Sequence, residues 1–176
     1  MDRHAVHEEM ERAQKSFHAM LDTASNTELR RRSSGTRWNN KQLLFHMLLG
    51  YLLIRTLRPL MLMFGRLPEW VNSSFAWLLN AAAPPFHVIN YAGAWLAGSV
   101  LSRRQLKWLF DRTAVALHRQ LDAETESSLG RGMRFPTRWD PFFRHVMTVA
   151  DIYHYATEHY DFHRQQLTLL GRPGRP

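Results

Sequence analysis

The chain has 176 residues, of which 45% are hydrophobic, and its 23 Lys and Arg against 15 Asp and Glu give a formal net charge of +8. A chain of this size can bury one core, so we expect a single domain over residues 1–170 followed by a flexible tail at 171–176. The absence of cysteine excludes a disulfide framework, a thiolate metal site and a cysteine nucleophile.

The N-terminal residues MDRHAVHEEMERAQ contain no apolar stretch of the secretory kind, so we expect a cytoplasmic protein. Residues 43–64 are very apolar but are interrupted by His, Arg and Pro, and residues 70–102 lack Asp, Glu, Lys and Arg but are divided by Pro and Asn. A membrane span needs about 20 uninterrupted apolar residues, so none is expected. Whether the apolar segment 59–101 forms a pocket wall, a subunit interface or a membrane contact stays open. The positive charge comes without a nucleic-acid motif, so no nucleic-acid partner is expected.

Helical periodicity predicts the first two long helices. The first places one apolar face toward a core, with Val6, Met10, Ala13, Phe17, Met20 and Leu21. A polar loop follows over 25–36. The second helix begins near Asn39 or Asn40, where an Asx side chain can cap it, and Pro59 kinks or ends it.

The remaining elements are also helical. Two short helices, at about 70–82 and 87–100, are divided by Pro84-Pro85. The third long helix has one face formed by Leu106, Leu109, Phe110, Thr113, Leu117 and Leu121, and a loop follows over 130–141. The last helix opens at the capping pair Thr148 and Asp151 and stops at Gly171. No sheet and no internal repeat is predicted. The fold class is all-α, a four-helix bundle with extra short helices between the second and third long helices.

Two histidines of the last helix lie on its inward face. His159 and His163 follow Ala156 by three and seven residues, and because they are four apart they stand one above the other. Two imidazoles in this arrangement can chelate one metal ion. The other histidines lie near the terminus, on polar faces or in the apolar middle segment, and are not expected to share the ion.

The third candidate ligand is His46, within the apolar run LLFHMLL of the second helix. By itself it could be a core histidine that a backbone carbonyl satisfies. With His159 and His163 also facing the core, three buried imidazoles would need partners, and a shared cation is the simplest way to satisfy them.

Short motifs around these histidines resemble the DinB-like family. The run 36–48, TRWNNKQLLFHML, is similar to that family's entry into its second helix, and the run 159–167, HYDFHRQQL, is similar to its closing motif with a Gln three residues after the second histidine. The segments 134–139 and 147–151 also resemble the approach to that last helix. The resemblance implies a four-helix bundle, often a homodimer, with one divalent transition metal (Zn, Ni, Fe or Mn) on His46, His159 and His163.

The resemblance also implies a metal-dependent enzyme, most simply a small-thiol-dependent S-transferase with a low-molecular-weight thiol as cosubstrate. We expect the thiol to attack an electrophilic, apolar small molecule. The acceptor would be held by the apolar segment with Trp70, Phe75, Trp77, Phe86 and Trp95, and an anionic group of the thiol by Arg37, Arg134 or Arg138. An alternative is a small-molecule hydrolase that uses activated water, which a nearby carboxylate base would favour. Glu158 and Asp161 flank the histidines but project off the inward face. A non-enzymatic metal-binding or stress protein is the remaining alternative.

Overall fold

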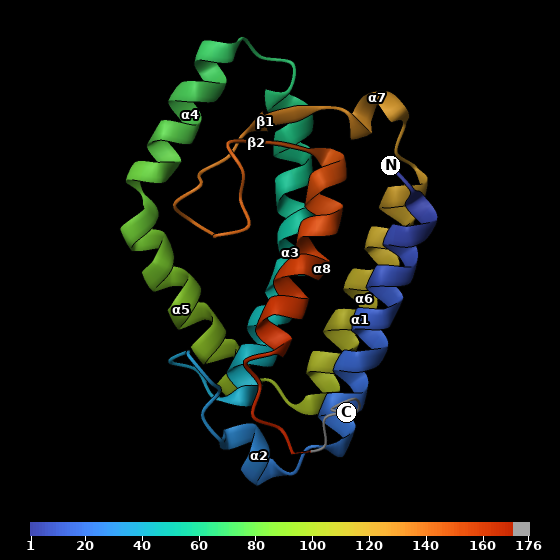
Figure 1. Ribbon diagram of the computed structural model, residues 1–176, viewed down its shortest axis with the longest axis vertical. Coiled ribbons are helices and arrows are strands. Elements are labelled where there is room, and N and C mark those ends of the chain that lie inside the picture. The colour runs from blue at the N-terminus through green and yellow to red at the C-terminus, as the bar shows by residue number, and fades with distance from the viewer. Residues whose placement is uncertain (171–176) are drawn as a thin grey trace.

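Four long helices lie side by side in the computed structural model, which describes residues 1–170 (Figure 1). The described elements are α1 (Arg3–Thr23), α2 (Asn26–Arg30), α3 (Asn40–Phe64), α4 (Glu69–Ala81), α5 (Ala83–Val100), α6 (Arg103–Asp122), α7 (Glu126–Leu129), β1 (Gly132–Arg134), β2 (Val146–Thr148) and α8 (Val149–Arg164). The long helices α1, α3, α6 and α8 enclose one apolar core, to which each contributes its buried face. The predicted all-α bundle is therefore confirmed.

Capping side chains set where the helices begin. Reciprocal capping boxes join Asn39 to Gln42 at α3, Ser102 to Gln105 at α6, and Thr148 to Asp151 at α8. In each box a side chain accepts from a free amide of the first turn while the third helical residue bonds back to the cap, so two unsatisfied amides gain partners. The predicted starts of α3 and α8 are thus correct.

The helices α4 and α5 form an arm outside the bundle. Figure 1 shows them end to end along one side, carrying the chain from one end of α3 back to the other, so that α6 runs parallel to α3. Such a long crossover connection is one of the known bundle topologies. The arm closes on the bundle where Gly98 of α5 packs directly on the backbone of Gln42 in α3.

Several local predictions were wrong. Of the two predicted effects of Pro59, a kink or an end, the end is wrong, because α3 continues to Phe64. Pro84 and Pro85 lie inside the first turn of α5, where the missing amide costs nothing. The expected loop at 25–36 contains the short helix α2, and a second short helix that was not predicted, α7, precedes the expected loop at 130–141; each is opened by a capping box. The last helix ends at Arg164, before the predicted stop. Gly171 and the expected tail at 171–176 lie outside the described residues.

A small sheet was also missed. β1 and β2 pair antiparallel, with Met133 opposite Met147, and enclose an eleven-residue loop at 135–145. Two three-residue strands are too short to show a period of two. The indole N–H of Trp139 in this loop donates to the carbonyl of Leu79 at 2.6 Å, and its ring stacks on Phe86, so the loop is anchored to both helices of the arm.

Among the described residues, α3 is the one helix that is long and apolar enough, by length and composition, to cross a membrane. Several of its apolar side chains, including Leu43, Leu44, Met47, Leu48 and Ile54, are buried in the core, and the core helix of a soluble protein passes the same test; 39% of the most apolar window of α3 is buried.

Candidate metal centre

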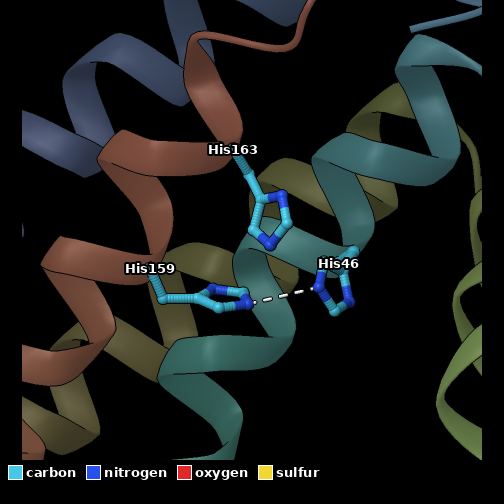
Figure 2. A group of neighbouring side chains, drawn as sticks. All are labelled: His46, His159 and His163. Atoms are coloured by element: carbon cyan, nitrogen blue, oxygen red, sulfur yellow. Dashed lines mark hydrogen bonds between the residues drawn. The ribbon is translucent and has the colours of Figure 1, made fainter. Parts of the chain in front are cut away.

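The structure brings the three predicted histidines together between α3 and α8. His46 lies in the second turn of α3, and His159 and His163 lie on successive turns of α8 (Figure 2). The ring centroids are separated by 4.8 Å between His46 and His159, 4.7 Å between His46 and His163, and 4.5 Å between His159 and His163. The three rings thus form a nearly equilateral triangle.

Their nitrogens point toward a common position. The Nε2 atoms of His46 and His159 are 3.2 Å apart, and in Figure 2 a nitrogen of His163 points toward the gap between these two rings. One nitrogen from each ring can be chosen so that all three lie within 4.8 Å of one another. Imidazoles arranged in this way have the donor type and convergence of a divalent transition-metal site with open coordination positions.

Neighbouring residues fix the orientation of each ring. The Nδ1 of His163 is 2.7 Å from the side-chain oxygen of Gln166. This oxygen can accept a hydrogen bond from a protonated Nδ1, which leaves the lone pair of Nε2 free to bind a cation. The indole of Trp38 stacks on His46 with centroids 4.4 Å apart. Gly50 makes room for His159, because a Cβ at this position would lie 2.7 Å from its Nδ1.

Burial keeps the imidazoles in the neutral form that binds metals. It lowers the pKa of His46 to about 3, with a smaller contribution from His163. Burial also lowers the pKa of His159 well below its usual value, and lowers that of His163, where the bond to Gln166 acts in the opposite direction. Since no protons need to be displaced at neutral pH, cation binding is not opposed by protonation.

The polar atoms of the centre suit a bound cation. His46 and His159 are almost fully buried, and the facing Nε2 pair can form at most one hydrogen bond between two neutral rings. Neither Nδ1 atom of these two residues has a hydrogen-bond partner among residues 1–170. Leaving buried polar atoms unsatisfied costs free energy, and a shared ion would recruit the lone pairs that face one another.

A carboxylate that the sequence did not reveal lies beside the centre. Asp140 Oδ2 is 3.9 Å from His159 Nε2 and accepts a hydrogen bond of 3.0 Å from the Tyr155 hydroxyl. Burial raises its pKa, which the amide of Phe142 and the Tyr155 hydroxyl partly offset. Asp140 belongs to the loop between β1 and β2, where no helical period relates it to the histidines. Of the two acidic residues that flank the histidines in sequence, Asp161 forms an ion pair with Arg12 and Glu158 is exposed.

Two hollows of different character meet at the histidines. An enclosed cavity of about 220 Å³ lies between the bundle and the arm and contacts His46, His159 and Asp140; its apolar wall includes Leu53, Leu57, Phe75, Phe86, Met133 and Phe135. A second, more open hollow of about 330 Å³ contacts His163 and Gln166, with Arg37, Trp38, His87 and Tyr91 around it. Asn90 of α5 lines both hollows.

Of the other residues predicted to line a substrate pocket, some line one of these two hollows and the others lie outside them. Phe75 and Phe86 line the enclosed cavity, whereas Trp70, Trp77 and Trp95 are exposed on the outside of the arm. Of the three arginines, Arg37 lines the open hollow, Arg134 forms an ion pair with Glu69, and Arg138 is exposed on the 135–145 loop. His87 lines the open hollow and contacts the carbonyl of Arg138.

The fold and this centre define a helical bundle with a three-histidine group able to hold a metal ion. The family model of the DinB superfamily matches residues 9–167, and the chain belongs to that superfamily, a metal-binding family. Searches of curated proteins and of solved structures found no match.

Proposed function

We propose that the chain is a divalent-metal-dependent enzyme that joins a low-molecular-weight thiol to an apolar electrophile. The observation that favours two substrates is the pair of hollows on either side of the three histidines, one enclosed and apolar and the other open and polar. A thiol with a charged body suits the open hollow, and an apolar acceptor suits the enclosed cavity.

In this proposal His46, His159 and His163 hold the ion, and Arg37 binds an anionic group of the thiol. A divalent ion on three imidazoles lowers the pKa of a thiol or water that reaches it. Trp38 and Gln166 keep two of the rings oriented. The apolar wall of the cavity excludes water and directs the acceptor carbon toward the centre. The thiol loses its proton, its sulfur bonds to that carbon, and the leaving group departs with its electron pair.

The first test is metal content and thiol transfer by the purified, untagged protein. We expect about one equivalent of transition metal and thiol-dependent conjugation of 1-chloro-2,4-dinitrobenzene with at least one of glutathione, cysteine and coenzyme A. His46→Ala and His159→Ala should lose both. His154→Ala changes a histidine of the same helix that contacts Glu9 instead of the centre, so it should retain both. A parent protein that binds no metal after reconstitution with Ni²⁺, Zn²⁺, Fe²⁺ and Mn²⁺ would contradict the proposal.

Arg37→Gln separates thiol binding from the chemical step. Loss of one charge-assisted contact should raise the KM for an anionic thiol about ten-fold, with kcat changed much less. An unchanged KM would remove Arg37 from the thiol site.

A second candidate function, hydrolysis by activated water, is favoured by Asp140. Its carboxylate lies beside the histidines and also lines the enclosed cavity, where it could accept a proton from water. Asp140→Asn should then lower hydrolysis of an apolar p-nitrophenyl ester by about 10²-fold while metal content is retained. Ester hydrolysis without any thiol-dependent activity would favour this reaction, and bound metal without either activity would favour a non-enzymatic role.

A further inference from the structure

The outer face of the arm is apolar and exposed. Eight large apolar side chains of α4 and α5, here called the arm face, are between 51% and 72% exposed: Trp70, Trp77, Leu78, Val88, Ile89, Trp95, Leu96 and Val100. Scattered apolar residues on a surface are ordinary, but eight large ones on the exposed sides of two successive helices indicate an interaction site. The arm lies on one side of the molecule, away from α1 and α6 (Figure 1).

The arm face is a property of helical spacing. On α4, Trp70 and Trp77 are seven residues apart and Leu78 follows Trp77, so these three share one side of the helix. Phe75 and Leu79 turn toward the enclosed cavity. On α5 the same division holds, since Val88, Ile89, Trp95 and Leu96 are exposed while Phe86 and Asn90 line the cavity. Both sides of each helix are therefore apolar, one against the protein and one against its surroundings.

Charge around the arm face has one sign. Residues 70–102 contain no Asp, Glu, Lys or Arg. Four exposed arginines on the segments next to these helices form no ion pair with an acidic residue in the part of the chain that the structure describes, and are here called the rim arginines: Arg37, Arg66, Arg104 and Arg138. Arg66 precedes α4, and Arg104 lies in the first turn of α6, which follows α5. The backbone of Arg138 bonds both helices, through Asn80 and His87. The nearby Glu69 is already paired with Arg134.

We propose that the arm face docks on the surface of a bilayer that contains anionic lipids. Trp, Leu, Ile and Val would enter the boundary between head groups and acyl chains, where tryptophan is most favoured, and the rim arginines would contact lipid phosphates. The net charge of +8 adds long-range attraction to the same surface.

A second copy of the chain is less suited to bind the arm face, because the rim arginines are all positively charged. A two-fold dimer through the arm face would place the rim arginines of one protomer opposite those of the other, and like charges facing each other oppose association. The homodimer that the family resemblance implies would then use another surface.

Docking would also bring the enclosed cavity close to apolar molecules dissolved in the bilayer. Phe75, Leu79 and Phe86 line the cavity from the opposite side of the helices that carry the arm face. An apolar molecule dissolved in the bilayer would thus be separated from the cavity by the thickness of α4 and α5. The docking itself does not rest on the proposed function, because none of the eight arm-face residues belongs to the metal centre and, of the rim arginines, Arg37 alone also lines the proposed thiol site.

The experiment is flotation of the full-length protein with vesicles of phosphatidylcholine, with and without phosphatidylglycerol, at low and high salt. We expect binding that requires phosphatidylglycerol and weakens with salt. Trp77→Ser combined with Ile89→Ser should reduce the partition coefficient by at least about ten-fold. Val115→Ser is the control, because Val115 is 48% exposed on α6 and lies about three turns beyond Arg104. Arg66→Gln combined with Arg104→Gln should reduce binding by about ten-fold, whereas Arg55→Gln on α3 should not.

Three results would overturn the proposal: no vesicle binding by the parent, binding that the arm-face double variant retains, or a dimer in light scattering that the same double variant dissociates. The last would make the arm face a protein interface. Metal content of each variant, expected to equal that of the parent, separates this test from that of the proposed function.

Discussion

Gln166 is the residue that gives the candidate metal centre a defined tautomer. Its side-chain oxygen lies 2.7 Å from His163 Nδ1, so the proton is held on that nitrogen and Nε2 is directed to the other two rings. Gln166→Leu should weaken metal binding by about 10- to 100-fold, the usual effect of losing such a partner, with little change in the unfolding of the metal-free protein. Gln166→Glu retains an acceptor and should bind metal close to the parent level. Competition with a chromophoric chelator measures both, and equal affinity for the leucine variant would contradict the role.

Among the single residues of the site, the sequence predicted those whose positions are set by helical spacing. His159 and His163 are one turn apart on an apolar face, and His46 lies in an apolar run, so their convergence follows once α3 and α8 pack together. Asp140 could not be found in this way because its position is set by the loop at 135–145. That loop is fixed by Trp139 and by a two-stranded pairing with no sequence period.

Among the elements, α3 depends on a buried ion pair. Arg58 lies within the apolar sequence of α3 and forms an ion pair with Glu124. The Glu124 side chain is 1% exposed and also accepts a hydrogen bond from the Ser128 hydroxyl. Arg58→Ala should lower the free energy of unfolding by about 3 kcal/mol, since it leaves a buried carboxylate without its cation. Arg55→Ala, at an exposed position of the same helix, should change it by less than about 0.5 kcal/mol. Denaturant unfolding of both variants measures the difference, and equal losses would show that the pair does not stabilise α3.

The junction between α5 and α3 makes a second prediction at this scale. A Cβ on Gly98 would collide with the backbone of Gln42, whereas a Cβ on Gly93 meets nothing within 4 Å. Gly98→Ala should therefore destabilise the protein by about 1–3 kcal/mol through overpacking. Gly93→Ala, in the same helix, should stabilise it by about 0.5–1 kcal/mol through the higher helix propensity of alanine. Thermal unfolding gives both signs, and a neutral Gly98→Ala would mean that the arm shifts freely on the bundle.

The long helices were predictable because their apolar faces repeat over many turns, and the short elements were not. α2 and α7 are five and four residues long and are set by capping boxes inside polar sequence. The predicted end of α3 at Pro59 was wrong for a different reason. The helix continues past the proline because Met61 and Phe64 beyond it are buried in the core. The exposed side of the arm was equally hidden, since a sequence apolar on both sides of a helix does not show which side faces the protein.

For the whole molecule, packing α1 against α6 partly buries a histidine pair that links stability to pH. His7 and His118 face each other with their Nδ1 atoms 2.5 Å apart, and His7 also contacts Asp122 through Nε2. Burial, and then the charge of His7, lowers the pKa of His118 below its ordinary 6.5, although Glu11 and Asp122 act in the opposite direction. Burial lowers the pKa of His46, His159 and His163 as well.

The sign of the effect follows from proton binding. Below pH 6.5 the four histidines with a lowered pKa (His46, His118, His159 and His163) are protonated more fully in the unfolded chain than in the fold, so the unfolded state binds more protons and stability falls as the pH falls. Above pH 6.5 both states are neutral and stability is level. The carboxylates with lowered pKa, such as Glu28 at about 2, lose their contribution only in more acidic solution, so the interval from pH 7.5 to 5.5 isolates the histidines.

We therefore expect the metal-free protein to lose stability between pH 7.5 and pH 5.5, and His118→Gln to lose less over the same interval because its amide cannot be protonated. Urea unfolding at both pH values measures the two losses. His4→Gln is the control, since His4 is 82% exposed and its substitution should leave the pH dependence unchanged. An equal loss in His118→Gln and the parent would show that the pair between α1 and α6 accepts a proton without strain, and would leave the three histidines of the metal centre as the source of the pH dependence.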